Sequence, residues 1–595
     1  MRQYQQKYID NIREIAQLSN FYSVPADDFD AWYAHHSASR RRINDLRSEN
    51  IRLLSTYFFP VIDNLYSASE EELMDLTEFS LQLMDWTTNL DCGLYILIHE
   101  SLLSMYRYQK NRAGIIRELY NLGMGLYYQD RMIQGIDDQR TARFLFRNEM
   151  VFTEAGSYLR FFDEIEDEET KGYIIRALAN IAICTSDRKR RVAVSAKILR
   201  IVQDPFYREK APGLPWDTFL RRTHQQMSAN RDVLSKGNMS AEELSLILES
   251  CQVVFEPEIN TDKPNIRWLW PYYEMEYSCG FVDLQTTLAR MEKLIFDASY
   301  DQYDYSGLYA NVQLPIYYGR LIRDNPSLAG RQRHIQILSR AYAKMMKTLM
   351  TFPQEDFGDF YYYNITLVIT DYYETAGVET YRSVTEKLMR KMSGLLYVDA
   401  LMTGKIMETL CSAIYDDTPE FFRDLPVFHS ADKESLLEYA RLCGLYCNFG
   451  LIKMNIRRIQ QSRNLLEPEY ELYQLHAASG YDDLRRHPST KAFADIALGH
   501  HSWYSGGGYP DDYVRNESVY RQMTDIAAVA SYLTEKRDTA DSPVEMIFQE
   551  KRGRFSSRVL SWLHDPAVQQ AVETILKDEK ELYRTVFSSL KNEQN

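Results

Sequence analysis

The stretch SEEELMDLTEFSLQLM (residues 69–84) opens with a serine and carries a glutamate three residues later. In this arrangement the hydroxyl of Ser69 accepts a hydrogen bond from an early backbone amide, and the carboxylate of Glu72 reaches back to the amide of the serine. The apolar residues that follow recur at helical spacing, at Leu73, Leu76, Leu83 and Met84. The stretch therefore predicts an α-helix with a defined first turn.

The same pattern recurs along most of the chain before residue 385. Ser240 precedes Glu243 by three residues and opens another apolar run. After Asp187, one helical face is again apolar, at Val192, Ala196, Leu199 and Val202. Strand-like alternation of any length is missing from this sequence. Short helices separated by small polar breaks predict an all-α fold of stacked α-hairpins.

One segment within this region, ELYNLGMGLYYQD (118–130), resembles a helix of a TPR repeat. A clean 34-residue period, which a regular TPR array would show, is not present. The resemblance implies a TPR-like solenoid in the first half of the chain.

A chain of 595 residues is too long for one hydrophobic core, so we expect several domains. Two proline-containing breaks, DPFYREKAPGLPWD (204–217) and FEPEINTDKPNIRWLWP (255–271), interrupt the helical pattern. We expect a helical-hairpin array over residues 1–235 and a second helical region over 236–385, which either continues the first or stands apart. The third expected domain covers residues 386–585.

The composition excludes several classes of function. The net charge is −15 with 69 Lys and Arg against 84 Asp and Glu, which argues against a broad basic surface for nucleic acid or for anionic membranes. The seven cysteines form no CxxC pair, so zinc ribbons and thioredoxin-like motifs are excluded. Neither an apolar signal core at the start nor a long apolar run is found, so we expect a cytoplasmic protein. The 44 tyrosines indicate aromatic packing between helices, or a binding groove.

Three segments of the last third occur in a specific order: LLEPEYELYQLHAASG (465–480), GHHSWYSGGGYP (499–510) and DIAAVAS (525–531). Together they resemble an HD-GYP domain. In the middle segment the matching residues are His500, His501, Gly506, Gly508, Tyr509 and Pro510. In the first segment they are His476 and Gly480. The resemblance implies an all-helical, metal-dependent phosphohydrolase fold of the kind associated with cyclic di-GMP breakdown.

The chain departs from the family's pattern at most of the implied metal ligands. Cys447 and Asn448 stand where the defining His-Asp pair is expected, and an amide cannot bridge two metal ions as a carboxylate does. Asp399 stands at an earlier histidine position and Ser531 at the last aspartate position. The family's lysine is replaced by Leu451, and an acidic pair in the loop is replaced by Ser502 and Ser505.

The remaining residues allow one metal ion at most. His476, His500 and His501, with Asp399 or Cys447 as a substitute ligand, could hold a single iron, manganese or zinc ion. The alternative is a site without metal. For Cys447 the favoured alternative is a small buried core residue, because it continues an apolar helix face. The glycines at 506–508 are expected to shape the loop through positive φ rather than to bind phosphate.

No P-loop, no GxSxG elbow and no dinucleotide fingerprint occurs in the sequence. The resemblance and its departures together imply a signalling protein whose HD-GYP-like domain no longer catalyses. It would act by binding a cyclic dinucleotide or a protein partner such as a diguanylate cyclase domain. Two alternatives stay open: an active phosphodiesterase with a remodelled metal site, and a helical-repeat scaffold for protein interactions.

Overall fold

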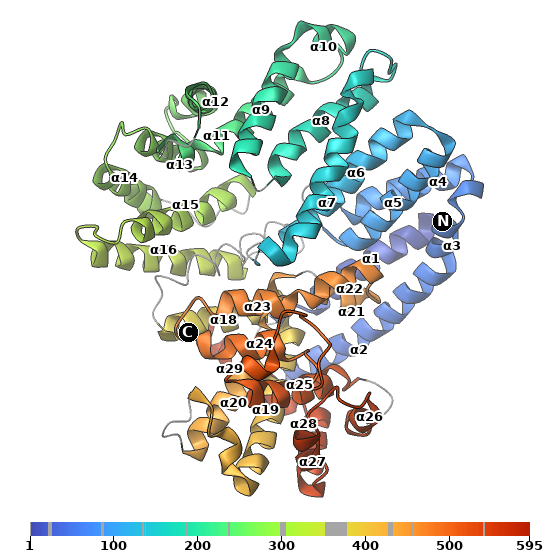
Figure 1. Ribbon diagram of the computed structural model, residues 1–595, viewed down its shortest axis with the longest axis vertical. Helices are drawn as coiled ribbons and strands as arrows, with labels where there is room; N and C mark the ends of the chain where they lie inside the picture. The colour runs from blue at the N-terminus through green and yellow to red at the C-terminus, as the bar shows by residue number, and fades with distance from the viewer. Residues whose placement is uncertain are drawn as a thin grey trace. The chain divides into compact units, whose positions relative to one another are not determined.

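The protein is described by a computed structural model that covers residues 2–21, 27–84, 89–133, 136, 138–185, 187–235, 239–297, 305–351, 378–426, 432–454, 456–538 and 542–594 (Figure 1). These residues are almost entirely helical. Among them, β-pairing is limited to two isolated bridges, Met84 with Asn89 and Ser502 with Gly508. The predicted all-α class is therefore confirmed.

None of the helices in the described ranges combines the length and the apolar character that a membrane span requires.

The chain divides into two compact units. The first consists of Met1–Gln5, Ser55–Arg131 and Asp138–Asn364, and the second consists of Gln6–Leu54, Met132–Asp137 and Ile365–Asn595. Residues 6–54, which lie near the start of the chain, thus cluster with its C-terminal third. The domain boundaries expected at 235 and 385 stay predictions.

The first unit contains helices that follow one another with short connections. They are α3 (Phe59–Asp63), α4 (Glu70–Leu83), α5 (Cys92–Gln109), α6 (Arg112–Arg131), α7 (Asp138–Ser157), α8 (Glu168–Cys184), α9 (Arg188–Gln203), α10 (Pro205–Lys210), α11 (Trp216–Ser228), α12 (Ala241–Ile259), α13 (Ile266–Ser278), α14 (Leu284–Asp297), α15 (Tyr305–Asp324) and α16 (Arg331–Thr351), with short helices η3 (Leu65–Ser67), η4 (Tyr158–Phe161) and η5 (Arg231–Ser235).

Helices α5 to α9 each pack on the next one in sequence, and α6 also packs on α8. This is how stacked α-hairpins bury their apolar faces. Both capping boxes expected from the sequence are present: Ser69 with Glu72 opens α4, and Ser240 with Glu243 opens α12. The two proline-containing segments do interrupt the helices, before and after α10 and between α12 and α13. A TPR arrangement stays a prediction.

The second unit is built from helices of both chain ends. They are α1 (Arg2–Leu18, from Gln6 onward), α2 (Phe29–Leu53), α18 (Val378–Met392), α19 (Gly394–Asp417), α20 (Lys433–Cys447), α21 (Ile456–Ser462), α22 (Glu467–Gln474), α23 (His476–Leu484), α24 (Ala494–Gly499), α25 (Arg521–Glu535), α26 (Pro543–Gln549), α27 (Ser557–Leu563), α28 (Pro566–Lys577) and α29 (Lys580–Gln594), with η6 (Pro419–Phe422), η8 (Phe449–Lys453), η9 (Lys491–Phe493) and η10 (Arg515–Glu517). The π-helical segment η2 (Leu54–Phe58) follows α2.

The most extensive helix pair of this unit is α19 with α20, which lie side by side (Figure 1). Two glycines make the close approach feasible. A Cβ atom on Gly444 would lie 2.5 Å from the Cα atom of Gly404, so any side chain there would force the helices apart. This contact positions the end of α20, where Cys447 and Asn448 lie.

Helix α2 packs on α21 and on α29, and an aromatic cluster joins it to α29. The Trp32 side chain is buried, with 1% of its surface exposed. Its ring lies 5.5 Å from that of Phe21, 6.0 Å from that of Tyr583 and 5.6 Å from that of Phe587. Such aromatic contacts and the buried area make Trp32 the main anchor of the N-terminal helices on the C-terminal ones.

We expect Trp32→Ala to destabilise the second unit by about 3–5 kcal/mol, because truncating a buried aromatic residue leaves a large cavity. Arg41→Ala, at an exposed position of the same helix, is the control and should change the free energy of unfolding by less than about 0.5 kcal/mol. Pulse proteolysis in urea, with detection of a C-terminal tag, measures both. Equal effects of the two substitutions would contradict the anchoring role.

Candidate metal centre

Four short segments of the second unit bring together the polar residues of the candidate site. Asn448 directly follows α20, His476 is the first residue of α23, His500 directly follows α24, and Ser531 lies near the end of α25. Each lies at or near a helix terminus. The side chains at such places can converge without interrupting the helices that carry them.

A backbone contact brings two of these segments together. A Cβ atom on Gly450, in η8, would overlap the carbonyl oxygen of His476, and it would also lie 2.6 Å from the amide nitrogen of Gly480. Only glycine allows η8 to rest directly on the backbone of α23. This contact places Asn448, two residues before Gly450, beside the histidines.

The ligand atoms of His476, His500 and His501 all lie within 4.8 Å of one another. Within the described part of the chain, this is the one group of three or more His, Cys, Asp or Glu residues with that geometry. His476 and His500 are buried, and His501 is largely so. The structure thus brings together the three histidines that the sequence analysis singled out.

Two of the rings are held by backbone carbonyls. Nδ1 of His476 lies 2.5 Å from the carbonyl oxygen of Tyr473, and Nδ1 of His500 lies 2.8 Å from that of Ala497. A carbonyl oxygen can only accept, so each Nδ1 carries the proton and donates it. This leaves Nε2 of each ring as the potential ligand atom, which is the usual arrangement around metal-binding histidines.

His500 and His501 are neutral near pH 7. Burial lowers the pKa of His500 to about 4. Burial also lowers the pKa of His501 to well below its ordinary value, and the neighbouring His500, His476 and Arg554 lower it further. Neutral imidazole is the form that binds metal ions, so no proton has to be displaced at these two rings.

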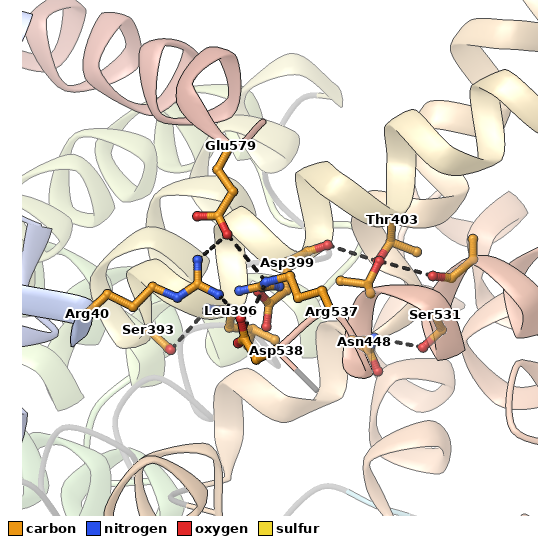
Figure 2. Close-up of polar contacts among 12 residues, drawn as sticks. Arg40, Ser393, Leu396, Asp399, Thr403, Asn448, Ser531, Arg537, Asp538 and Glu579 are labelled. Atoms are coloured by element: carbon orange, nitrogen blue, oxygen red, sulfur yellow. Dashed lines mark hydrogen bonds and ion pairs between the residues drawn. The ribbon is translucent and has the colours of Figure 1, made fainter. Parts of the chain in front are cut away.

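The unprotonated Nε2 atoms of His476 and His500 lie close together. Nε2 of His476 lies 3.3 Å from Nε2 of His500, and the side-chain oxygen of Asn448 lies 3.0 Å from the same Nε2 of His500. The Asn448 amide is held in this orientation because its nitrogen donates to Ser531 Oγ at 3.4 Å (Figure 2). Two nitrogens on a tetrahedral zinc ion, with Zn–N bonds of about 2.0–2.1 Å, are about 3.3–3.4 Å apart. The observed separation of 3.3 Å between the two Nε2 atoms matches the distance expected for two ligands of one tetrahedral zinc ion.

His501 is oriented by the loop that follows it. Its ring stacks on Tyr509 at 4.5 Å. The loop turns back because the glycines at 506, 507 and 508 adopt φ values of 93°, 101° and 78°, a region that other residues avoid. The predicted loop-shaping role of these glycines is confirmed. The Tyr509–Pro510 peptide bond is cis.

The serines that replace acidic residues of the loop both donate to backbone carbonyls. Ser502 Oγ donates to Tyr509 O at 3.3 Å, and Ser505 Oγ donates to Gly553 O at 3.0 Å. Both hydroxyls therefore stabilise the loop rather than extend the ligand set.

The two substitute ligands considered from the sequence lie outside the histidine group. Cys447 is buried, its thiol donates to Gly444 O at 3.3 Å, and burial raises its pKa to about 12. This is the geometry of a core residue. Asp399 is paired with the guanidinium of Arg537, as Figure 2 shows.

Glu535 was missed in the sequence analysis. Its Oε1 lies 3.7 Å from His501 Nε2, and it also lies within 3.5 Å of Ser531 Oγ. The sequence contains a pattern that indicates this position. Glu535 follows Ser531 by one helical turn, so both side chains lie on the same face of α25. Arg537 had no comparable signal in the sequence.

The space beside the histidines is small. A cavity of about 20 Å³ is lined by His500, His501 and Glu535 together with aromatic residues and Arg554. A water molecule needs about 10–15 Å³, so the cavity accommodates one water and no nucleotide. The residues therefore fit one metal ion and its water. They do not fit the two-metal centre that the family resemblance implies, because no carboxylate lies in the histidine group to bridge two ions.

In protein treated with a chelator, we expect stability to fall as the pH decreases from 6.5 towards 4. The folded state lowers the pKa of His500, so in this window the unfolded state binds the additional proton. In a His500→Asn variant, the free energy of unfolding should depend less steeply on pH, by up to about 1.4 kcal/mol per pH unit. Urea denaturation at pH 7 and pH 5 measures this difference, and equal slopes would contradict it.

Comparison of the chain with protein-family models, with curated proteins and with solved structures gives no match in any of the three. The description of the site therefore rests on the geometry given above.

Proposed function

We propose that the second unit is a degenerate HD-GYP-like domain that holds one divalent metal ion at His476, His500 and His501. The protein would act in cytoplasmic signalling by binding a cyclic dinucleotide or a protein partner, and not by hydrolysis. The observation that carries this proposal is the arrangement of the three buried histidines, with two anchored rings whose Nε2 atoms lie 3.3 Å apart.

All candidate ligands near the histidines are neutral except Glu535. Three imidazoles are a common ligand set for zinc and also suit iron or manganese. Because neutral ligands leave the charge of a divalent ion uncompensated, a nearby carboxylate is favourable, and Glu535 lies 3.7 Å from His501 Nε2. A divalent ion at this position would polarise a bound water and lower its pKa.

Three features argue against hydrolysis of a cyclic dinucleotide. Asn448 supplies a neutral oxygen in place of a bridging carboxylate. Asp399 is engaged by Arg537. The cavity at the histidines, about 20 Å³, is too small for a phosphodiester. Each feature removes something that phosphoryl transfer requires: charge neutralisation, a second metal ion or room for the substrate.

A second candidate function is supported by Glu535. Its carboxylate lies beside His501 and lines the small cavity, where it could accept a proton from a water molecule. A mononuclear phosphodiesterase with a remodelled site would use this residue as a base. Hydrolysis abolished by Glu535→Gln would favour this alternative.

We expect the purified protein to contain one equivalent of zinc, iron or manganese after dialysis, and the His500→Ala variant to contain less than a tenth of that amount. His35→Ala, at an exposed position of α2, should retain full occupancy. Elemental analysis measures all three proteins. Between pH 8 and pH 6, protonation of His500 and His501 should not compete with the ion, because burial lowers the pKa of both, that of His500 to about 4. Absence of metal from the wild-type protein would refute the metal centre.

With manganese, iron or zinc supplied, we expect no turnover of cyclic di-GMP above the rate without protein. Chromatography of the nucleotide after prolonged incubation measures this. Turnover that requires His500 would overturn the proposed loss of catalysis, while leaving the metal centre in place.

A further inference from the structure

A larger cavity of about 370 Å³ lies elsewhere in the second unit. Its walls come from α2, α19, α21 and α25 with the residues that follow α25, so both ends of the chain contribute to it. None of the three histidines lines it. Its volume falls in the range of about 300–1,000 Å³ that is usual for sites of small organic ligands.

Three arginines line this cavity: Arg40, Arg47 and Arg537. Arg47 donates from Nε to Gln460 O at 2.9 Å and from Nη2 to the side chain of Asn464 at 2.6 Å. Both acceptors are neutral. Within the part of the chain that the structure describes, Arg47 forms no ion pair, and three of its five N–H groups are not used by these two bonds.

Arg537 contributes a donor that forms no hydrogen bond. Its side chain is only 7% exposed, and its buried Nε faces Glu579 Oε1 as an ion-pair partner at 3.5 Å without a hydrogen bond to it. The other end of the guanidinium pairs with Asp399 (Figure 2). A buried donor without an acceptor costs free energy, and an anion in the cavity would supply the acceptor.

Arg40 has one strong and one replaceable partner. It pairs with Glu579, which is largely buried, and its Nη2 lies 2.5 Å from Asp538. The Asp538 side chain is 61% exposed, so this second ion pair is weak and can be exchanged for another anion. Figure 2 shows Arg40 and Arg537 meeting around the carboxylates of Asp399, Asp538 and Glu579.

We propose that this cavity binds a phosphorylated small molecule about the size of a nucleoside monophosphate, with its phosphate held by Arg40, Arg47 and Arg537. A phosphate offers three acceptor oxygens and up to two negative charges, which match several guanidinium groups better than a single carboxylate does.

The rest of the cavity suits the organic part of such a ligand. Asn44, Gln460 and Gln461 provide amide groups that both donate and accept hydrogen bonds, as polar rings or hydroxyls require. Ile43 and Leu395 provide an apolar wall. The other ten of the twelve residues that line the cavity are polar or charged, which suits a polar ligand rather than an apolar one.

This site goes beyond the metal centre and does not depend on it. Glu535 lines both cavities, so a ligand in the larger one would lie next to the residue beside His501.

Isothermal titration calorimetry with GMP, AMP and inorganic phosphate tests the proposal on the full-length protein, with guanosine and adenosine as the matched probes without phosphate. We expect at least one mononucleotide to bind and the nucleosides to bind at least tenfold more weakly. Arg47→Gln should reduce the affinity for that mononucleotide at least tenfold, and Arg47→Lys should reduce it less. Arg41→Gln, on the exposed side of the same helix, should leave it unchanged. Circular dichroism establishes that each variant is folded.

The assignment is overturned if none of the phosphorylated probes binds, or if a probe binds equally well to the folded Arg47→Gln variant. Binding that His500→Ala abolishes and Arg47→Gln does not would assign the ligand to the histidine site instead. Binding that persists in the His500→Ala variant separates this proposal from the metal centre, whose failure would show only in the metal content.

Discussion

The packing of helix α2 against the C-terminal helices is the contact on which the second unit depends. The ring of Trp32 is buried among Phe21, Tyr583 and Phe587, which come from both ends of the chain. A Cβ atom on Gly394 would lie 2.5 Å from the ring of Phe21, so this seam is closely packed as well. The contact buries the start of the chain and forms one wall of the larger cavity. Helix α2 therefore contributes both to the stability of the second unit and to the wall of the larger cavity.

The histidine group has a fixed geometry and contains no carboxylate. The rings stay in place because Tyr473 and Ala497 carbonyls hold two of them and Tyr509 stacks on the third. Burial keeps His500 and His501 neutral, which suits a metal ion and disfavours protonation. Without a bridging carboxylate, however, a second divalent ion would add uncompensated charge in a buried place. One ion is what this electrostatic environment supports.

Asp399 belongs to the larger cavity and not to the histidine group. At a position where the family resemblance implies a metal ligand, its carboxylate instead neutralises Arg537, and Arg537 in turn meets Arg40 around Glu579. The Asp399 carboxylate is thus part of an ion-pair cluster at the larger cavity. A carboxylate paired with an arginine is not available to a metal ion, because the buried guanidinium would lose its counter-charge.

The sequence by itself determined the helical class, both capping boxes and the loop built on three positive-φ glycines, because each depends on local spacing or on residue type. The family resemblance, and not local spacing, grouped the three histidines. The sequence could not show that residues 6–54 join the C-terminal unit, that Cys447 turns to Gly444 or that Asp399 pairs with Arg537. These features depend on which helices meet and at what distance. Apart from the Cys447–Gly444 hydrogen bond, which spans three positions, these contacts join residues more than a hundred positions apart, and only the packed tertiary structure decides them.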